Sequence, residues 1–268
     1  MHKWNPADYE RSSSAQCSWA TGLISGLDLG GDEIIMDIGC GNGKISAILA
    51  SLVPEGRVVG IDLSREMIDF ARSKYPKEDF PNLSFQVGDA SALNFREEVD
   101  LAVSFACLHW VKDHLPVLEG VYCSLRPGGR ILFQCGGRGN AAKILDITED
   151  LIRSERWEEY FQGFCFPYHF YGPEEYKRWL SQAGLKAGRV ELVPKEMVHV
   201  GQAGLEGFIR NTWLPYTERL PAGLRPEFVS EVARRYIERY PLDEEGRVRV
   251  AMMRLEVEAE KPALRSRP

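Results

Sequence analysis

Asp37-Ile38-Gly39-Cys40-Gly41-Asn42-Gly43 is the stretch that decides the fold of this chain. It follows a short apolar run, residues 34–38, and precedes an apolar helical pattern that Pro54 stops, so it joins a buried strand to a helix. Glycines there let the backbone turn sharply and let a ligand approach the N–H groups that open the helix. Their spacing is G-x-G-x-G, and Lys44 occupies the third glycine position of the dinucleotide pattern G-x-G-x-x-G. The stretch therefore predicts a cofactor loop that departs from the nicotinamide type.

Two more acids end the strands that follow. Asp62 comes about 20 residues after the loop, at the end of an apolar run, where a carboxylate can accept hydrogen bonds from both ribose hydroxyls. Asp89 ends the next run, where a carboxylate can face an adenine amino group. One such acid alone more often caps a helix. Three acids ending three successive strands, together with the glycine loop, favour a nucleoside site.

Strand and helix patterns alternate along the chain in short units. This alternation predicts an α/β fold with a doubly wound, mostly parallel sheet. Residues 200–240 are helical and aromatic in pattern. The predicted strands are 34–38, 57–61, 83–87, 100–105, 130–134, 189–193 and 248–259, and the predicted helices are 15–29, 45–52, 64–74, 115–125 and 173–183.

Composition excludes several classes of protein. The chain has 268 residues, of which 44% are hydrophobic and 27% charged, which is ordinary for a globular fold. The net charge of -6 argues against the broad positive field of nucleic-acid-binding proteins. No apolar run reaches the roughly 20 residues that span a bilayer, and the start of the chain does not resemble a signal peptide. The six cysteines form no C-x-x-C pair and the histidines no zinc-ligand spacing. We expect a cytoplasmic monomer or homodimer with no metal, nucleic acid or membrane partner.

The motif set resembles the class I S-adenosylmethionine-dependent methyltransferases. It consists of the loop, the two acids and Leu125-Arg126-Pro127-Gly128-Gly129, and it covers residues 31–135. The resemblance implies a Rossmann-like, seven-stranded sheet whose last strand is antiparallel. It also implies one methyltransferase domain over 1–268, with a cofactor-binding core at 31–135. Residues 1–30 and 196–246 would form a helical lid, and 136–195 and 247–262 the rest of the sheet and the substrate pocket.

The resemblance also implies S-adenosylmethionine as the cofactor and assigns roles in binding it. Gly39 and Gly41 would pass under the methionine moiety, and Asp37 would approach its amino group. Asp62 would hold the ribose, and Asp89 with its neighbour would contact the adenine. The predicted cofactor-binding residues are Asp37, Gly39, Cys40, Gly41, Asp62, Leu63, Asp89, Ala90 and Ser104.

A narrower resemblance concerns the acceptor. Ala106-Cys107-Leu108-His109-Trp110-Val111 is similar to trans-aconitate and juvenile-hormone acid methyltransferases, which esterify carboxylates of small molecules. The segment from Tyr9 to Trp19 is similar to their lid helix. The resemblance implies that Gln16 and Trp110 hold the substrate carboxylate. Carboxylate O-methylation of a small molecule is therefore our first hypothesis, with Gln16, His109 and Trp110 as the catalytic candidates.

Other functions stay open at this point. One alternative is that the enzyme methylates a hydroxyl, an amine or a carbon atom of a small molecule. Another is that the chain is a non-catalytic module that binds S-adenosylmethionine. A nicotinamide-dependent oxidoreductase fits the loop spacing poorly. Nucleic-acid amino-methylation is disfavoured, because the segment after the fourth predicted strand, residues 104–107, departs from N-P-P-Y.

His109 and His114 are candidate general bases, because imidazole titrates near neutral pH. The alternative is that His109 is packed in the core and His114 is solvated. A carboxylate acceptor needs no base, since it is already a nucleophile and orientation alone supplies roughly 7–11 kcal/mol. A base is needed only for a hydroxyl, a protonated amine or carbon.

Nine aromatic residues between 157 and 176 follow neither helical nor strand spacing. They form either a core or the wall of an apolar acceptor pocket. Residues 208–216 are predicted to cap the same mouth, where Arg210 would meet an anionic substrate, unless it is an ordinary surface charge. The predicted substrate-binding residues are Gln16, Trp110, Tyr168, Arg210 and Trp213.

Overall fold

The computed structural model describes residues 14–263, so the earlier part of the predicted lid, with Tyr9, lies outside the described residues. Its sheet has seven strands in the order β3-β2-β1-β4-β5-β7-β6. Pairing is parallel from β3 across to β5 and antiparallel between β5 and β7. The strands are β1 (Ile34–Ile38), β2 (Arg57–Asp62), β3 (Leu83–Val87), β4 (Val99–Phe105), β5 (Leu125–Gly136), β6 (Lys186–Val200) and β7 (Arg247–Glu260). The predicted doubly wound α/β fold with an antiparallel last strand is confirmed.

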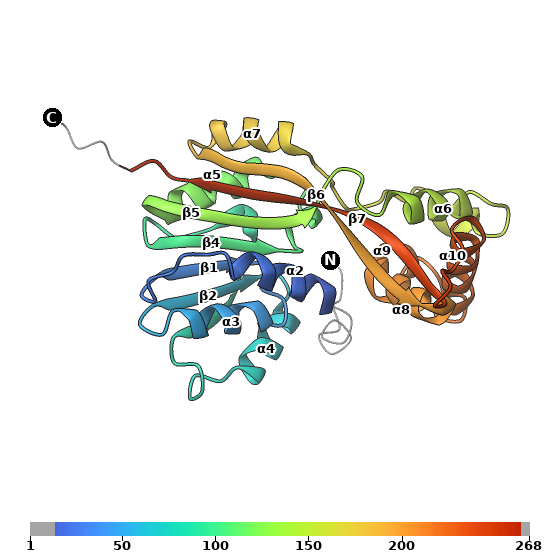
Figure 1. Cartoon of the computed structure of the whole chain (residues 1–268), viewed down its shortest axis with the longest axis horizontal. Helices are drawn as coiled ribbons and strands as arrows, with labels where there is room; N and C mark the ends of the chain where they lie inside the picture. Colours follow the sequence, from blue (N-terminus) through green and yellow to red (C-terminus); the bar gives the residue numbers. More distant parts are fainter. Residues whose placement is uncertain (1–13, 264–268) are drawn as a thin grey trace. The chain divides into compact units, whose positions relative to one another are not determined.

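Helices cover both faces of this sheet (Figure 1). One apolar core lies under α2 (Ser14–Ile24), α3 (Lys44–Leu52) and α4 (Arg65–Lys74), and a second under α5 (Leu115–Ser124) and α7 (Pro173–Gln182). The cap of α4 shows why the chain folds this way locally. Ser64 Oγ accepts the Met67 N–H at 3.2 Å, and Met67, Ile68 and Ala71 point into the core, as the sequence predicts. Helix α2 ends at Ile24, five residues before the predicted end.

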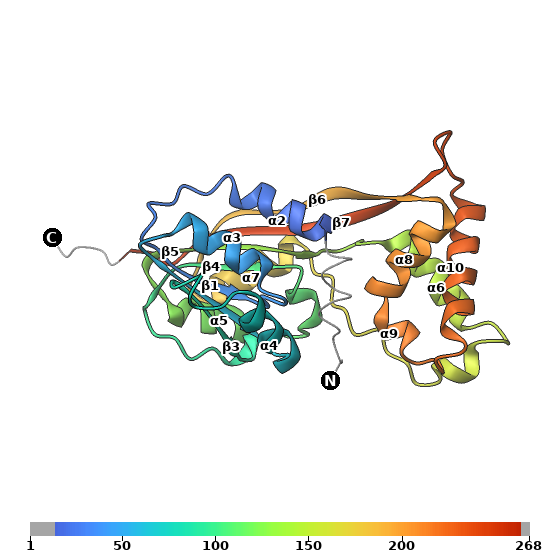
Figure 2. The same ribbon diagram turned by 90° about the horizontal axis from the view of Figure 1, so that it is seen from below.

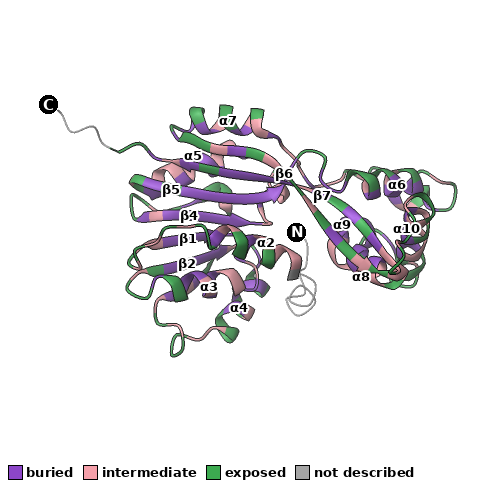
Figure 3. Cartoon of the chain, viewed as in Figure 1, coloured by how far each residue is buried: buried purple, intermediate pink, exposed green. Residues whose placement is uncertain are grey.

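Strand β4 and the second half of β5, residues 131–136, are almost entirely buried (Figure 3). Strands covered on both faces are apolar on both, which is why their sequences show continuous apolar runs. The predicted turn at 127–129 is absorbed into β5 as an irregularity: Val99 pairs with Leu125, but Leu101 pairs with Arg130. Gly128, at φ 84°, lies in the residues that bulge out between these pairs.

The described residues divide into two compact units, the first made of 14–138, 169–193 and 254–263 and the second of 139–168 and 194–253. Strand β6 extends beyond the predicted 189–193 at both ends and continues from the first unit into the second, whereas β7 matches the predicted 248–259 to within one residue at each end. In the second unit, α10 packs against both α6 and α8 (Figure 2). The helices described there are α6 (Ala142–Ile152), α8 (Gly201–Thr212), α9 (Leu214–Thr217) and α10 (Arg225–Arg239), with a short 3-10 turn η3 (Glu158–Phe161).

Much of the aromatic segment after residue 156 forms the core of the second unit. Phe161 stacks on Phe228 at a centroid distance of 5.6 Å, and Trp157 donates its indole N–H to Glu231 at 3.0 Å. Tyr216, which is buried, donates to Glu149 at 2.6 Å. Of the two interpretations of this segment, core packing therefore accounts for these rings. The helices predicted at 200–240 are present, and their role as a lid stays a prediction.

Candidate functional site

The glycine loop after β1 turns back tightly on its neighbours. Gly39, Gly41 and Gly43 have φ values of 73°, 54° and 78°, in the left-handed region that glycine adopts without strain. The N–H groups of Gly39 and Cys40 both donate to the Ile61 carbonyl, at 2.7 and 3.0 Å. A Cβ on Gly39 would lie 2.1 Å from Cys107 Sγ. The spacing of the glycines therefore reflects both the backbone turn and the close approach of the segment after β4.

The acids that end β2 and β3 are oriented by backbone amides. Asp62 accepts the Gly41 N–H on one oxygen and the Ser64 N–H on the other, both at 2.9 Å. Burial raises the pKa of Asp62, and the two amide hydrogen bonds lower it, with a net rise. Asp89 caps the short 3-10 turn η1 (Ala90–Ala92) by accepting the Ser91 N–H at 2.8 Å. Each carboxylate is thus oriented by backbone N–H groups and still has lone pairs for a ligand.

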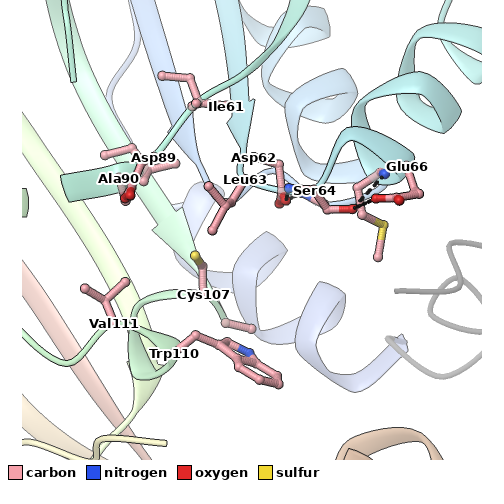
Figure 4. Close-up of a pocket in the computed structure, with 16 residues that line it drawn as sticks. Ile61, Asp62, Leu63, Ser64, Glu66, Asp89, Ala90, Cys107, Trp110 and Val111 are labelled. Carbon is pink, nitrogen blue, oxygen red and sulfur yellow. Dashed lines mark hydrogen bonds between the residues drawn. The ribbon is translucent and has the colours of Figure 1, made fainter. Parts of the chain in front are cut away.

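A cavity of about 290 Å³ lies over the carboxyl ends of β1 to β4, where ligands of open α/β sheets bind. Figure 4 shows Asp62, Leu63, Asp89 and Ala90 on one side of it and Cys107, Trp110 and Val111 on the other. The lining residues are Ile38, Gly39, Gly41, Ile61, Asp62, Leu63, Ser64, Glu66, Met67, Gly88, Asp89, Ala90, Ala106, Cys107, Trp110 and Val111. Seven predicted site residues are therefore brought together: Gly39, Gly41, Asp62, Leu63, Asp89, Ala90 and Trp110.

A second, smaller cavity of about 30 Å³ shares Gly39 and Ala106 with the first. Gln16, Asp37 and Cys40 line it, together with Cys17, Asn42, Lys44, Ile45 and Phe105. Gln16 Oε1 and Asn42 Nδ2 are buried there without a hydrogen-bond partner among the described residues. Buried polar atoms are rarely left unpaired, so these two indicate a missing polar partner.

Asp37 lies beneath the loop, and its carboxylate is 1% exposed. Ser46 Oγ donates to Asp37 Oδ2 at 2.6 Å and ties the loop to the first turn of α3. Burial raises the pKa of Asp37 to about 7; the Ser46 hydrogen bond opposes this rise and the nearby Asp62 carboxylate adds to it.

These residues fit a nucleoside that carries a charged amino-acid end. The two ordered carboxylates suit hydroxyl and amino groups, and Leu63, which is 50% exposed, offers an apolar surface to a flat base. The smaller cavity offers an unpaired acceptor on Gln16, an unpaired donor on Asn42, and the carboxyl of Asp37. An ammonium and a carboxylate on one ligand would satisfy groups of both kinds.

Two predicted site residues of the first unit line neither of these cavities. Ser104 is 1% exposed and its hydroxyl donates to the Ile38 carbonyl at 2.8 Å, so this side chain joins β4 to β1. His109 lines neither cavity. Burial and, to a smaller extent, the positive charge of Arg254 lower the pKa of His109 to about 3, so the ring is neutral at pH 7.

The expectation of a solvated His114 is wrong. Its ring is 1% exposed and is surrounded by Tyr171, Tyr176 and Trp179, with centroid distances of 4.9, 5.3 and 5.7 Å. Burial lowers the pKa of His114 to about 4, although its hydrogen bonds to backbone carbonyls oppose that shift. The prediction was wrong because the polar residues next to His114 in the sequence suggest exposure, whereas the aromatic rings that bury it come from residues 171–179, far along the chain.

Three predicted substrate-binding residues belong to the second unit. Tyr168 donates its hydroxyl hydrogen to the Thr212 carbonyl at 3.0 Å, and its ring lies 6.0 Å from that of Trp213. Trp213 is 3% exposed, and its indole N–H has no hydrogen-bond partner among the residues the structure describes. Arg210 is exposed. Their role toward a substrate stays a prediction.

Sequence reasoning missed several cavity residues, among them Ser64, Met67, Ala106 and Cys107. All follow the carboxyl end of a strand, which is the one signal that the sequence carries for them. Ala106 also has a φ of 55°, a conformation that costs an L-residue roughly 1–2 kcal/mol and that the sequence does not reveal.

The described chain offers neither a metal cluster nor a membrane span. Among residues 14–263, no three His, Cys, Asp or Glu side chains lie close enough together to hold a metal ion. No helix in the same range is both long enough and apolar enough to cross a membrane.

Comparison with known proteins agrees with this geometry. A family described as "Methyltransferase domain" matches residues 35–129. The chain is 32% identical to a trans-aconitate 2-methyltransferase of Streptomyces coelicolor, over 91% of this chain and 82% of that protein. It is 28% identical to the juvenile hormone acid O-methyltransferase of Drosophila melanogaster, over 75% of this chain and 70% of that protein.

The solved structures share the fold. The YcgJ protein of Bacillus subtilis has a TM-score of 0.64 at 16% identity, covering 92% of this chain and 100% of that one. A geranyl diphosphate C-methyltransferase from Streptomyces coelicolor, solved with S-adenosyl-L-homocysteine, has a TM-score of 0.55 at 17% identity, covering 92% and 80%. With a 32% identical relative that matches over 91% of this chain, and a cavity beside its glycine loop, the chain belongs to the class I S-adenosylmethionine-dependent methyltransferases.

Proposed function

We propose that this methyltransferase transfers the methyl group to a carboxylate oxygen of a small molecule. The observation that carries the proposal is that Gln16 and Trp110 line two cavities that share Gly39 and Ala106. Each of the two adjoining cavities thus has a side chain with an N–H donor in its lining. The names of the two curated relatives, one acting on trans-aconitate and one on juvenile hormone acid, support a small carboxylic acid as the acceptor.

The cofactor is proposed to lie across both cavities. Asp62 would accept hydrogen bonds from the ribose, Asp89 would face the adenine amino group, and Leu63 would pack on the base. Asp37 and Asn42 would contact the amino-acid end in the smaller cavity. When bound, S-adenosylmethionine supplies a methyl group on a positively charged sulfur. An ionised carboxylate can accept this methyl group directly, because it carries no proton that must first be removed.

The chain's own contribution is then orientation. Gln16 Nε2 and the Trp110 indole N–H would each donate to the acceptor carboxylate and hold one oxygen in line with the methyl group. Alignment of this kind supplies roughly 7–11 kcal/mol of the barrier reduction. A general base is not needed, which agrees with the low pKa, about 3, that burial gives His109.

The test uses methyl-labelled S-adenosylmethionine with a series of small carboxylic acids and a fractionated small-molecule extract. Product treated with mild base is expected to release labelled methanol, because a methyl ester hydrolyses under those conditions. If the label is stable to base, the acceptor is not a carboxylate, and the methyl group has been transferred to a hydroxyl, an amine or carbon.

Two variants test the proposed acceptor contacts. Gln16→Leu and Trp110→Phe each remove one donor, and each is expected to lower kcat/KM for the acceptor by roughly 10-fold or more, the worth of one hydrogen bond to a charged group. Trp157→Phe is the matched control, because Trp157 donates to Glu231 within the second unit. Equal losses in Trp110→Phe and Trp157→Phe would show that the effect reflects general destabilisation.

A further inference from the structure

The wall of the larger cavity opposite the acids is made by an irregular segment. It runs from Ala106, at the end of β4, through the 3-10 turn η2 (Leu108–Trp110) to Val111. Within it, the Trp110 N–H donates to the Cys107 carbonyl and the Val111 N–H to the Leu108 carbonyl. A segment this short does not satisfy all of its own backbone groups, so groups elsewhere in the fold must hold it.

His114 supplies part of that support. Its Nε2 lies 2.8 Å from the Leu108 carbonyl oxygen and 3.0 Å from the Val111 carbonyl oxygen. Both partners are acceptors, so Nε2 carries the hydrogen and donates to both. Nδ1 is then the acceptor in this neutral tautomer, and the Tyr176 hydroxyl lies 2.5 Å from it and donates.

Tyr176 fixes the orientation of the His114 ring. It lies on α7, is fully buried, and meets His114 edge to face at 90°. Burial raises the pKa of the Tyr176 hydroxyl, so the hydroxyl keeps its proton and remains a donor. Tyr176 also belongs to the same apolar core as Cys135 on β5. The chain of contacts therefore links the cavity wall to α7 and to the middle of the sheet.

The segment that precedes α7 holds the same wall from a second side. The His169 N–H donates to the His109 carbonyl at 2.8 Å, and the Tyr171 hydroxyl donates to the Lys112 carbonyl at 2.5 Å. Carbonyl groups of residues 108, 109, 111 and 112 are thus all held by donors from outside η2. Trp110 lies in the middle of these held positions.

We propose that His114 and Tyr176 are positioning residues for methyl transfer, which lock the η2 wall and so place Trp110 and Cys107 against the bound ligands. The part of this inference that concerns the acceptor rests on the proposed function, since Trp110 is its proposed acceptor contact. The ordering of the wall around the cofactor site does not depend on which acceptor is used.

Tyr176→Phe is the first test, because it removes one oxygen atom and keeps the ring that packs on His114. Tyr236→Phe is its matched control: Tyr236 is also fully buried, and its hydroxyl donates to the Arg249 carbonyl at 2.9 Å in the second unit. Hydrogen exchange of the amides of 107–112 and the Kd for S-adenosylhomocysteine are measured on both variants. We expect Tyr176→Phe to speed exchange in this segment at least 10-fold and to raise the Kd at least threefold, with β1 and β2 unchanged. Tyr236→Phe is expected to change neither.

His114 variants provide a second test if Tyr176→Phe folds poorly. His114→Ala removes the donor to both carbonyls, whereas His114→Gln keeps one amide N–H donor and one oxygen acceptor. Partial recovery of slow exchange and of S-adenosylhomocysteine affinity in His114→Gln, relative to His114→Ala, would support positioning through these hydrogen bonds. Equal exchange rates in Tyr176→Phe and Tyr236→Phe, or no difference between the two His114 variants, would overturn the inference.

Neither readout uses an acceptor. Methylation of a hydroxyl, an amine or carbon would therefore refute the proposed function, while the role of His114 and Tyr176 would still be decided by the exchange rates and the Kd. Once an acceptor has been identified, kcat in Tyr176→Phe is expected to fall at least 10-fold, while Tyr236→Phe keeps the wild-type value.

Discussion

Replacing Asp62 with Asn tests the cofactor site most directly. The Asp62 carboxylate accepts two backbone N–H groups at 2.9 Å each, from Gly41 and Ser64, and is proposed to accept the ribose hydroxyls as well. The side chain of Asn has one acceptor oxygen and one NH₂ donor, so at least one of these bonds is lost. A hydrogen bond to a charged group is worth about 1.5–3 kcal/mol, which corresponds to a rise in the Kd of roughly 10- to 150-fold.

The same substitution should leave the fold largely intact. Burial raises the pKa of Asp62, which means that its charge costs free energy in the folded protein. Asn removes that cost and offsets the lost backbone hydrogen bond, so we expect the free energy of unfolding to change by no more than about 1 kcal/mol. Isothermal titration with S-adenosylhomocysteine and urea unfolding measure the two quantities separately.

Asp100→Asn is the matched control for this measurement. Asp100 also accepts a backbone N–H, from Ile34 at 2.8 Å, and pairs with Arg126 at 3.0 Å, but it lies near the starts of β1 and β4, at the opposite edge of the sheet. Its Kd for S-adenosylhomocysteine should stay within about twofold of wild type. A Kd for Asp62→Asn within about threefold of wild type, or an equal rise in the control, would refute the ribose assignment.

The loop and its surroundings yield three further predictions. Because the pKa of Asp37 is raised to about 7 by burial, its contribution to the free energy of unfolding is fully present below about pH 4 and is lost as the pH rises to about 7. In Asp37→Asn, the free energy of unfolding measured by urea titration should depend less on pH between about pH 4 and 7 than it does in the wild type. An equal pH dependence in the two proteins would contradict the raised pKa of Asp37. Gly39→Ala should destabilise by about 2–5 kcal/mol, the sum of left-handed strain and overlap with Cys107 Sγ. Adding Cys107→Gly, which removes both the Sγ and the Cβ that the new methyl group would meet at 2.1 and 2.3 Å, should recover only the overlap, about 1–3 kcal/mol, so a double-mutant cycle with no coupling would count against a close approach of Cys107 to Gly39. Ala106→Gly should raise the free energy of unfolding by up to about 1 kcal/mol, because glycine adopts a φ of 55° without strain, whereas any loss of stability would show that Ala106 is unstrained.

The sheet and the cofactor loop were predictable because their signals are local. The apolar runs that became β1 to β4, the glycine spacing at 39–43 and the acids at strand ends are each contained in a few residues. Parallel pairing then brings those strand ends to one edge, so Asp62 and Asp89 reach the same cavity without further information.

The contacts that fix the wall of the cavity were not predictable in the same way. His114 and Tyr176 are 62 residues apart, and only the packing of α7 against α5 brings them together. Ser104 illustrates the opposite error: a polar residue at the end of β4 looked suited to a ligand, but its hydroxyl is used by the neighbouring strand. Local patterns locate strand ends, whereas the partner of each polar group depends on tertiary packing.

The strand order also bears on how the protein is made. β7 lies between β5 and β6 in the sheet but follows both in the chain, so β6 has no neighbour in the sheet until β7 has been synthesised. About 110 residues separate the end of β5 from the start of β7, which is roughly 5–20 s of ribosomal synthesis. During that interval the five parallel strands already have their sequences complete, and the edge of β5 is open to pairing with other chains. The nascent protein is therefore most vulnerable to aggregation after the residues of its cofactor site have been synthesised and before its last strand emerges.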